Sequence, residues 1–179
     1  MSEHPWLAAY PKHTKWDQDF TAKPLHSMVE KSAADYPDAI AYDFMGREMT
    51  FAELADQVNM MAKGLQDLGV GKGSHVGIFM PNCIQFAVAY FGILRAGGTV
   101  VNYSPLYSEP ELIAQVEDSE TDVMITLDLV ALYPTIQNVA RKSRLKKLVV
   151  DSFSGSLPFP KNILFRLFKG RMIAKVEQD

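Results

Sequence analysis

The order of apolar and polar residues predicts alternating strands and helices along most of the chain. Short apolar runs at residues 75–80, 99–102, 122–126 and 147–151 are typical of buried strands. Stretches with helical spacing or helix boundary signals separate each run from the next. Because the connections are only a few residues long, the strands should be parallel and joined by right-handed crossovers. We therefore expect an α/β fold with an open, doubly wound, mainly parallel sheet flanked by helices.

The helix boundaries are marked by capping signals. Thr50-Phe51-Ala52-Glu53 is a capping box, in which the threonine hydroxyl accepts from the Glu53 amide and the Glu53 carboxylate reaches back. The apolar residues that follow recur at helical spacing and predict one buried face: Phe51, Leu54, Val58, Met61, Leu65 and Leu68. Gly69 predicts a left-handed end to this helix. A second capping box at residues 108–111 predicts a helix that runs to about residue 119.

Three further elements are expected in the body of the chain. Residues 39–44 and 47–50 flank Gly46 and predict two short strands around a tight turn. Asn82 is expected to cap a helix that is apolar almost all round but too short to span a membrane. Pro134 is expected to interrupt the helix that precedes the last strand.

The two ends differ from this body. Residues 1–24 hold prolines and aromatic residues without helical or strand period, which predicts an extended arm whose aromatic side chains dock on a partner such as a second subunit. The α/β subdomain is expected to cover residues 25–151. Residues 152–179 predict an irregular tail, which begins with a disordered loop rich in Ser, Gly, Pro and Phe at residues 152–160.

The apolar and basic tail, residues 161–176, has two interpretations. A basic amphipathic helix would lie on a membrane surface. On a single helical wheel, however, Arg171 and Lys175 fall among the apolar residues. The alternative is a segment that packs on protein outside this chain.

Composition and charge narrow the class of protein. With 47% hydrophobic and 22% charged residues, the chain is expected to fold rather than remain disordered. A net charge of −3 argues against nucleic acid as the main ligand. The single cysteine, Cys83, cannot form an internal disulfide, and no secretory signal or membrane-spanning stretch is recognisable, so we expect a cytoplasmic protein. Residues 1–140 carry 8 Lys/Arg and 18 Asp/Glu, whereas residues 141–179 carry 10 and 3, which suggests that the two parts have different surroundings.

No catalytic constellation is recognisable in this sequence. The glycine-rich residues 69–74 do not fit a Walker loop, because Gln66 stands where that motif needs glycine and Gly73 stands where it needs serine or threonine. They do not fit a dinucleotide fingerprint either, because Ser74 replaces its third glycine. These residues instead predict a helix end with a turn. The four histidines lack metal-ligand spacing with one another or with Cys83, so no metal site is expected. No nucleophile elbow of the G-x-S-x-G type occurs.

The loop at residues 102–107 is the candidate ligand site. It follows the carboxyl end of a predicted parallel strand and precedes a capped helix, and ligands of open α/β sheets bind at that edge. A plain strand-to-helix connector is the alternative interpretation.

Several motifs follow the order and spacing of one enzyme family. They are HPWLAAYP at residues 4–11, MTF at 49–51, FMPN at 79–82, FGILRAG at 91–97 and NYSPLYSEPEL at 102–112. The chain resembles the amino-terminal part of bacterial long-chain fatty-acid–CoA ligases of the acyl-adenylate-forming, AMP-binding superfamily. The resemblance runs in register through about residue 128 and more loosely to residue 179.

This resemblance implies a two-step reaction for the parent protein. A fatty carboxylate attacks ATP with Mg²⁺ holding the phosphates, and coenzyme A then displaces AMP from the acyl-adenylate. The phosphate loop and catalytic lysine of the family do not occur here, so we expect an inactive fragment without a catalytic residue of its own and without a tightly bound cofactor.

The resemblance also implies where ligands and partners bind. It implicates the 102–107 loop in coenzyme A binding, through five residues: Asn102, Ser104, Pro105, Leu106 and Tyr107. It also implies that residues 152–179 form a basic and apolar connector toward downstream subdomains that this sequence lacks. A homodimer through the amino-terminal arm and peripheral contact with the inner membrane are further expectations. A self-contained α/β module that binds a partner or a membrane surface is the alternative function.

Overall fold

A parallel four-stranded sheet forms the centre of the molecule. The computed structural model describes residues 4–177. The strands lie in the order β4 (Thr99–Tyr103), β3 (His75–Phe79), β5 (Val123–Leu127) and β6 (Lys147–Asp151), and every neighbouring pair is parallel. The predicted alternating α/β fold is therefore confirmed, with strand boundaries within two residues of those expected.

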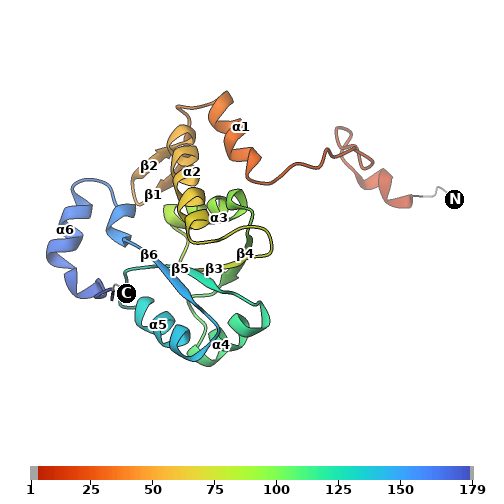
Figure 1. Cartoon of the computed structure of the whole chain (residues 1–179). Coiled ribbons are helices and arrows are strands. Elements are labelled where there is room, and N and C mark those ends of the chain that lie inside the picture. The colour runs from red at the N-terminus through yellow and green to blue at the C-terminus, as the bar shows by residue number, and fades with distance from the viewer. Residues whose placement is uncertain (1–3, 178–179) are drawn as a thin grey trace.

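Helices cover both faces of this sheet (Figure 1). α2 (Phe51–Asp67) and α3 (Ile84–Ala96) lie over one face, and α4 (Glu109–Asp118) and α5 (Tyr133–Lys142) lie over the other. The crossover from β3 to β4 runs in one direction along the sheet, and the next two crossovers run in the other. Right-handed connections place such crossovers on opposite faces. The direction changes at β3, and in doubly wound sheets this is where the carboxyl ends of the strands open a crevice.

A two-stranded hairpin stands beside the sheet. β1 (Ile40–Phe44) and β2 (Arg47–Thr50) pair antiparallel, as the sequence predicts, but they do not join the parallel sheet. Met45 and Gly46 form the turn with φ values of 55° and 87°. Two left-handed residues in succession give the turn a twist that matches that of the strands. α1 (Ser27–Asp35) packs beside α2 on the same side of the molecule.

The capping signals are confirmed in part. The Thr50 hydroxyl accepts from the Glu53 N–H at 3.2 Å, and the Glu53 carboxylate accepts from the Thr50 N–H at 2.9 Å. The Glu111 carboxylate likewise accepts from the Ser108 N–H at 2.8 Å and from its hydroxyl at 2.7 Å. Gly69 follows α2 with φ of 89°.

Two helix boundaries were predicted wrongly. Cys83 rather than Asn82 is the N-cap of α3, and its side chain makes no capping hydrogen bond. Pro134 lies in the first turn of α5 and does not interrupt the helix. The first turn has no partner for its N–H groups, so a proline there costs no hydrogen bond.

The core is built where α2 and α3 cross and where the sheet is covered on both sides. Every residue of β5 is buried. Gly92 of α3 lies directly against Met61 of α2, and a Cβ at Gly92 would come within 2.5 Å of the Met61 Cγ. Gly77 of β3 leaves room for the Tyr103 ring and the Met124 thioether, which pack directly against its backbone.

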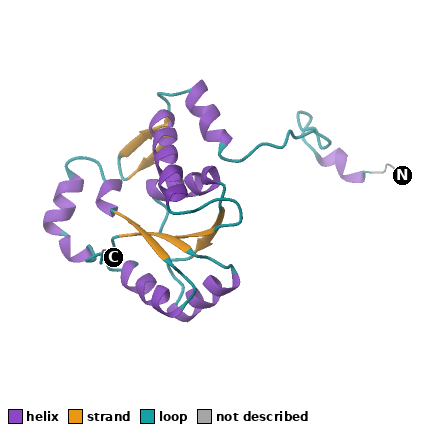
Figure 2. Cartoon of the chain, in the orientation of Figure 1, coloured by secondary structure: helices purple, strands orange, loops and turns teal. Residues whose placement is uncertain are grey.

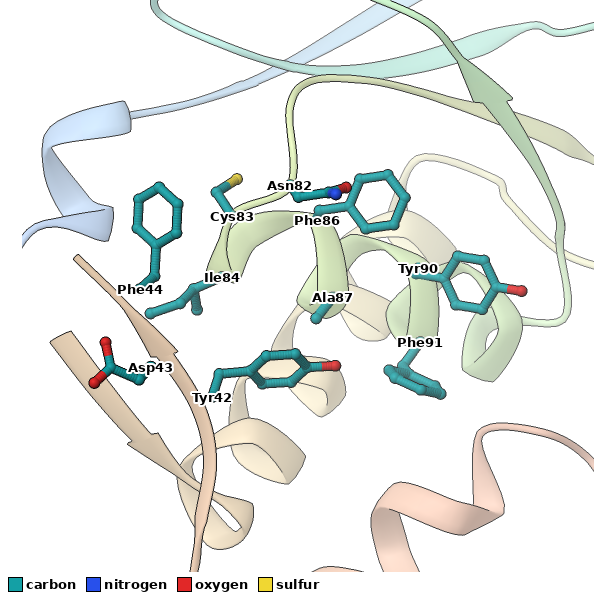
Figure 3. A pocket seen from close by; sticks show the side chains of 10 residues that line it. All are labelled: Tyr42, Asp43, Phe44, Asn82, Cys83, Ile84, Phe86, Ala87, Tyr90 and Phe91. Carbon is teal, nitrogen blue, oxygen red and sulfur yellow. The ribbon is translucent and has the colours of Figure 1, made fainter. Parts of the chain in front are cut away.

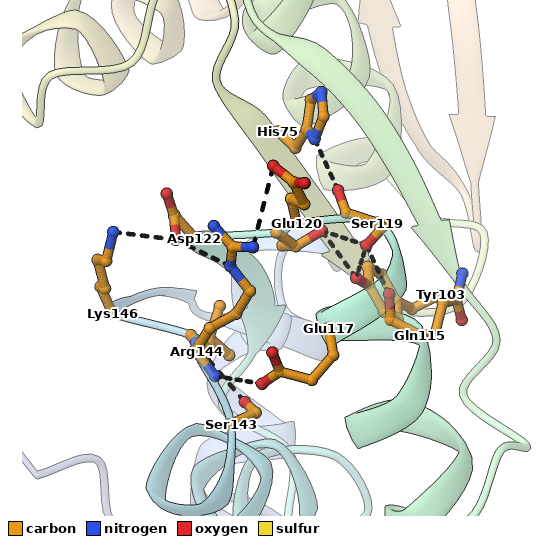
Figure 4. Close-up of polar contacts among 12 residues, drawn as sticks. His75, Tyr103, Gln115, Glu117, Ser119, Glu120, Asp122, Ser143, Arg144 and Lys146 are labelled. Atoms are coloured by element: carbon orange, nitrogen blue, oxygen red, sulfur yellow. Dashed lines mark hydrogen bonds and ion pairs between the residues drawn. The ribbon is translucent and has the colours of Figure 1, made fainter.

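A polar cluster closes the amino edge of the sheet (Figure 4). The Ser119 carbonyl oxygen accepts from His75 Nδ1 at 2.6 Å, and the Ser119 hydroxyl lies 2.8 Å from the Tyr103 hydroxyl. Asp122 pairs with Lys146 at 3.1 Å and with Arg144 at 3.5 Å. His75 begins β3, Asp122 precedes β5, and Lys146 precedes β6, so these groups join the starts of three adjacent strands. They lie at the edge opposite to the one where parallel sheets bind ligands.

The amino-terminal arm leaves the body (Figures 1 and 2). Residues 5–25 are exposed, including the short 3₁₀ helix η1 (Pro5–Ala9). The His4 ring lies 5.0 Å from the Trp6 ring and 4.4 Å from the Trp16 ring. The arm therefore makes its aromatic contacts within itself.

The carboxyl-terminal residues are more ordered than the sequence suggests. The loop expected to be disordered contains η2 (Phe153–Ser156), in which Ser154 and Ser156 are buried. It continues into α6 (Lys161–Phe168) and η3 (Gly170–Met172). The helix considered over residues 161–176 therefore ends at Phe168. None of the helices within residues 4–177 has the length and apolar character needed to cross a membrane.

Candidate functional site

Two hollows open at the carboxyl edge of the sheet. One lies beside the loop that follows β4, and the other lies between β1 and the start of α3. Asn82 and Phe86 line both hollows, so the Phe86 side chain stands between them. The residues that follow β3 therefore line both cavities, at the strand where the crossovers change direction along the sheet.

The first hollow contains the candidate site of the sequence. Its volume is about 590 Å³. All five residues expected to bind coenzyme A line it: Asn102, Ser104, Pro105, Leu106 and Tyr107. Met80 and Pro81 form part of the opposite wall. The structure thus brings the five residues together around one cavity, which is within the usual size of small-molecule sites.

The loop has a fixed backbone and exposed side chains. The Tyr107 N–H donates to the Ser104 carbonyl oxygen at 3.1 Å, and the Leu106 N–H donates to the Ser104 hydroxyl at 3.3 Å. Leu106 is 93% exposed and Tyr107 is 46% exposed. The Gln115 amide donates to the Asn102 carbonyl oxygen at 3.1 Å. An apolar side chain and a phenol are therefore held at the rim of the cavity.

Tyr103 at the start of this loop has a different orientation. Its ring lies against Gly77, and its hydroxyl donates to the Thr121 hydroxyl at 2.8 Å. Burial raises the pKa of the Tyr103 phenol. Tyr103 therefore anchors the loop in the core, and its neighbours face the cavity.

The second hollow was not predicted from the sequence. Its volume is about 420 Å³, and its wall is almost entirely apolar. Figure 3 shows it between β1 and α3, and the lining residues are Tyr42, Asp43, Phe44, Asn82, Cys83, Ile84, Phe86, Ala87, Tyr90 and Phe91. The sequence shows an aromatic face in each element separately. Tyr42 and Phe44 share one face of a strand, and Phe86 and Tyr90 share one face of a helix. Only the tertiary fold brings the two faces together.

The sole cysteine lies in the wall of this second hollow. Cys83 is buried, and burial raises the pKa of its thiol. A thiol of raised pKa is a poor nucleophile at neutral pH. The hollow therefore offers apolar contact surface rather than an activated side chain.

The structure identifies no metal-binding cluster. Within residues 4–177, no group of three or more His, Cys, Asp or Glu side chains is arranged to hold an ion. The glycine-rich residues 69–74 form a turn at the amino edge of the sheet, with Gly69 and Gly73 left-handed, as the sequence predicts.

Comparison with known protein families identifies the family. A family model described as AMP-binding enzyme matches residues 29–164, which include both hollows and the whole sheet. The chain belongs to the AMP-binding enzyme family.

The relatives of this AMP-binding family member include fatty-acid–CoA ligases. It is 40% identical over 167 residues to a long-chain-fatty-acid–CoA ligase of Bacillus subtilis, covering 93% of this chain and 30% of that protein. It is 36% identical over 162 residues to a protein of the same name from Escherichia coli O157:H7, covering 89% and 28%. The chain thus spans about 30% of the length of these relatives.

Solved structures show the same fold. A long-chain-fatty-acid–CoA ligase from Archaeoglobus fulgidus superposes with a TM-score of 0.66 at 23% sequence identity, covering 75% of this chain and 28% of that chain. At this identity the likeness concerns the fold. The α/β fold of this AMP-binding family member therefore matches one part of a longer protein.

Proposed function

We propose that this chain is the amino-terminal part of an ATP-dependent long-chain fatty-acid–CoA ligase. The observation that carries the proposal is the 40% identity to the Bacillus subtilis ligase over 93% of the chain, together with the AMP-binding family match. The reaction joins a fatty acid, ATP and coenzyme A into acyl-CoA, AMP and pyrophosphate through an acyl-adenylate. Mg²⁺ would neutralise the phosphates, because the first step brings two anions together.

The part that this chain plays is a scaffold and a ligand wall. The sheet fixes the loop after β4 through Tyr103, whose hydroxyl is held by Thr121. The phosphate loop and the catalytic lysine that the family resemblance leads us to expect do not occur in this sequence. We therefore expect the chain by itself to be inactive and to bind neither ATP nor coenzyme A tightly.

The test begins with the mass of the native polypeptide. Antibody raised against this chain identifies that polypeptide in a lysate of the source cells and purifies it for assay. A band much heavier than 20.0 kDa is expected, with palmitate-dependent exchange between ATP and pyrophosphate, whereas the isolated chain serves as the inactive control. A heavy polypeptide that shows no acid-dependent exchange would refute the ligase proposal.

The alternative is a self-contained α/β module. A native band of 20.0 kDa would favour that alternative, because the cell would then make this piece alone. The apolar hollow beside β1 would then be the first place to look for its ligand.

We further propose that the first hollow lies on the coenzyme A side of the complete enzyme. The exposed Tyr107 ring supports this assignment, since aromatic side chains stack on nucleotide bases. Tyr107→Ala in the complete enzyme should raise the KM for coenzyme A about tenfold and leave ATP–pyrophosphate exchange unchanged. Tyr36→Ala, a similarly exposed tyrosine beyond the end of α1, is the matched control. Unchanged coenzyme A kinetics would remove Tyr107 from the site.

The exposed arm supports a proposed homodimer. Trp6, Tyr10 and Trp16 all lie at the surface, and residues 5–25 make no buried contact with the body. Deleting residues 1–20 should convert a dimer to a monomer in sedimentation experiments. An unchanged mass per particle would refute the dimer contact. We place the enzyme in the cytoplasm, with peripheral contact at the inner membrane.

A further inference from the structure

The chain between β4 and β5 is closed into a ring by one buried phenol. It leaves β4 at Tyr103, forms the loop of residues 104–107, and enters α4 at the Ser108 capping box. At the far end of α4, the Ser119 hydroxyl lies 2.8 Å from the Tyr103 hydroxyl. The residue before the loop is therefore tied to the end of the helix that follows the loop (Figure 4).

Three hydroxyl groups make this connection. We call the side-chain hydroxyls of Tyr103, Ser119 and Thr121 the hydroxyl triad. The Tyr103 hydroxyl donates to Thr121 Oγ1 at 2.8 Å, and the Ser119 and Thr121 hydroxyls lie 2.8 Å apart. Ser119 itself donates to the Gln115 carbonyl oxygen at 2.6 Å. Because each hydroxyl has one proton to donate, the donation runs from Tyr103 to Thr121, then to Ser119 and on to the helix backbone.

The phenol of the triad is buried. Tyr103 is 3% exposed and Thr121 is 0% exposed. Burial raises the pKa of the Tyr103 phenol, so the hydroxyl stays protonated and remains a donor at neutral pH. A buried donor that lacks an acceptor is costly. The Tyr103 side chain is therefore held where its hydroxyl meets the two other members of the triad.

The neighbouring strand provides the space for the Tyr103 ring. A Cβ at Gly77 of β3 would lie 2.7 Å from the ring atom Cε2. Tyr103 pairs in register with Phe79, two residues beyond Gly77. The side chain therefore leans back along the sheet, from the carboxyl edge, where the loop begins, toward the amino edge, where the rest of the triad lies.

The acceptors of the phenol are fixed by other contacts. The Ser119 carbonyl oxygen accepts from His75 Nδ1 at 2.6 Å, which ties the end of α4 to the start of β3. The Gln115 amide donates to the Asn102 carbonyl oxygen at 3.1 Å, which ties α4 to β4. The end of α4 is therefore a fixed support to which Tyr103 is attached.

The loop depends on its two ends for its position. Within the described residues, the hydrogen bonds of residues 104–107 are internal to the loop: the N–H groups of Leu106 and Tyr107 donate to Ser104. None of residues 104–107 is buried. The place of the loop relative to the sheet is therefore set by the cap at its carboxyl end and by Tyr103 at its amino end.

We propose that Ser119 and Thr121 are positioning residues for the coenzyme A loop, and that they act on it through the Tyr103 phenol. Tyr103 lines the first hollow, whereas Ser119 and Thr121 do not. By holding the phenol, the two residues set where Leu106 and Tyr107 stand at the rim. This inference rests on the proposed coenzyme A role of the first hollow, and it adds residues outside the hollow to that role.

Three variants of the complete enzyme test the connection. Tyr103→Phe should raise the KM for coenzyme A about threefold, because the ring keeps its place but loses its bond to the end of α4. Ser119→Ala combined with Thr121→Val should raise it about tenfold, because the buried hydroxyl then lacks an acceptor and the ring moves with the loop. Adding Tyr103→Phe to that pair should return the KM to about threefold above the parent, since the unpaired hydroxyl is gone. The exchange between ATP and pyrophosphate should be unchanged in all three variants.

Ser143→Ala is the matched control for the loss of a serine hydroxyl. Ser143 follows α5 as Ser119 follows α4, and its hydroxyl likewise donates to the carbonyl oxygen four residues earlier, that of Val139, at 2.7 Å. Its hydroxyl is bonded to α5 and not to Tyr103. This substitution should leave the KM for coenzyme A unchanged.

Amide hydrogen exchange in the 179-residue chain tests the positioning without any ligase activity. The Leu106 and Tyr107 N–H groups should exchange about fivefold faster when both acceptors of the triad are removed, and Tyr103→Phe should reverse most of that increase. The Gly46 N–H donates to the Asp43 carboxylate at 3.0 Å in the hairpin turn. It is the internal reference and should exchange at an unchanged rate.

Equal loop exchange in the parent chain and in the chain without both acceptors would overturn the proposal. Faster exchange that Tyr103→Phe does not reverse would also overturn it, because the two residues would then act by another route. A raised KM for coenzyme A in Tyr107→Ala, but not after loss of both acceptors, would overturn the connection to coenzyme A. An unchanged KM in Tyr107→Ala itself would instead overturn the assignment of the first hollow to coenzyme A, and the exchange rates would still decide whether the triad positions the loop.

Discussion

Replacing Gly92 with alanine should destabilise the protein, although alanine is the better helix former. Gly92 lies in the interior of α3, where it is buried against α2. A Cβ at this position would lie 2.5 Å from the Met61 Cγ and 2.8 Å from the Met61 Cβ. The Met61 Cβ is fixed to the helix backbone, so the two helices would have to separate.

The magnitude follows from two opposed terms. Alanine gains about 1 kcal/mol over glycine in a helix interior through its lower backbone entropy. Overpacking a tight helix contact costs about 1–3 kcal/mol, and a contact below 3 Å with a backbone-linked carbon belongs at the upper end. The free energy of unfolding should therefore fall by about 1–2 kcal/mol. For a chain of this size, that lowers Tm by about 2–8 °C.

Gly64 provides a matched control within α2. It also lies inside a helix, but a Cβ there would meet nothing within 4 Å. Gly64→Ala should therefore raise the free energy of unfolding by about 1 kcal/mol, which isolates the helix-propensity term. Urea denaturation followed by far-UV circular dichroism measures both variants. Met61→Ala should also relieve part of the effect of Gly92→Ala in a double-mutant cycle. Equal stabilisation by the two glycine substitutions would refute the close-contact argument.

Three further predictions concern strained or buried residues. Met45→Asn should raise the free energy of unfolding by about 0.5–1 kcal/mol, because asparagine tolerates the left-handed turn better than methionine. A lower free energy of unfolding in urea denaturation would mean that the Met45 side chain is needed for packing. Glu120→Gly should raise the free energy of unfolding by about 0.5–1 kcal/mol, because glycine adopts the left-handed φ of 52° after α4 without strain. The exposed ion pair of Glu120 with Arg144 contributes little, so a loss of stability in this variant would show that the pair matters more than expected. Cys83 should react with an aromatic disulfide reagent more than about tenfold slower than free cysteine near pH 8, and faster at higher pH, because burial raises its thiol pKa; equal rates would show that the second hollow is open to solvent.

The fold could be predicted because its signals are local. Strand lengths, the capping boxes at Thr50 and Ser108 and the glycine at the end of α2 all depend on residues within four positions of one another. The boundary errors have the same origin. Asn82 has a good capping side chain but lies one residue too early, and only the path of the chain between β3 and α3 decides which residue takes the N-cap position.

The candidate site could be predicted only in part. The loop after β4 follows from a topological rule, since parallel strands place their carboxyl ends at one edge. The hollow beside β1 depends on Tyr42 and Phe44 meeting Phe86 and Tyr90, which lie more than forty positions away in the sequence. The sequence shows two apolar faces, and each alone is also typical of ordinary core packing. Nothing in either face indicates that the two leave space between them.

The carboxyl-terminal tail shows how the assumed length of a helix changes the pattern that its residues form. A wheel drawn over residues 161–176 mixes Arg171 with leucines because it assumes a helix that continues past Phe168. The chain turns at Gly170, which removes the later cations from the wheel and leaves an eight-residue helix with a clean apolar side. Its inner side is fixed by Arg166 and Phe165, so the apolar side has to face outward. Because that direction is set by contacts with residues distant in sequence, the exposed apolar surface follows from the tertiary structure and not from the periodicity.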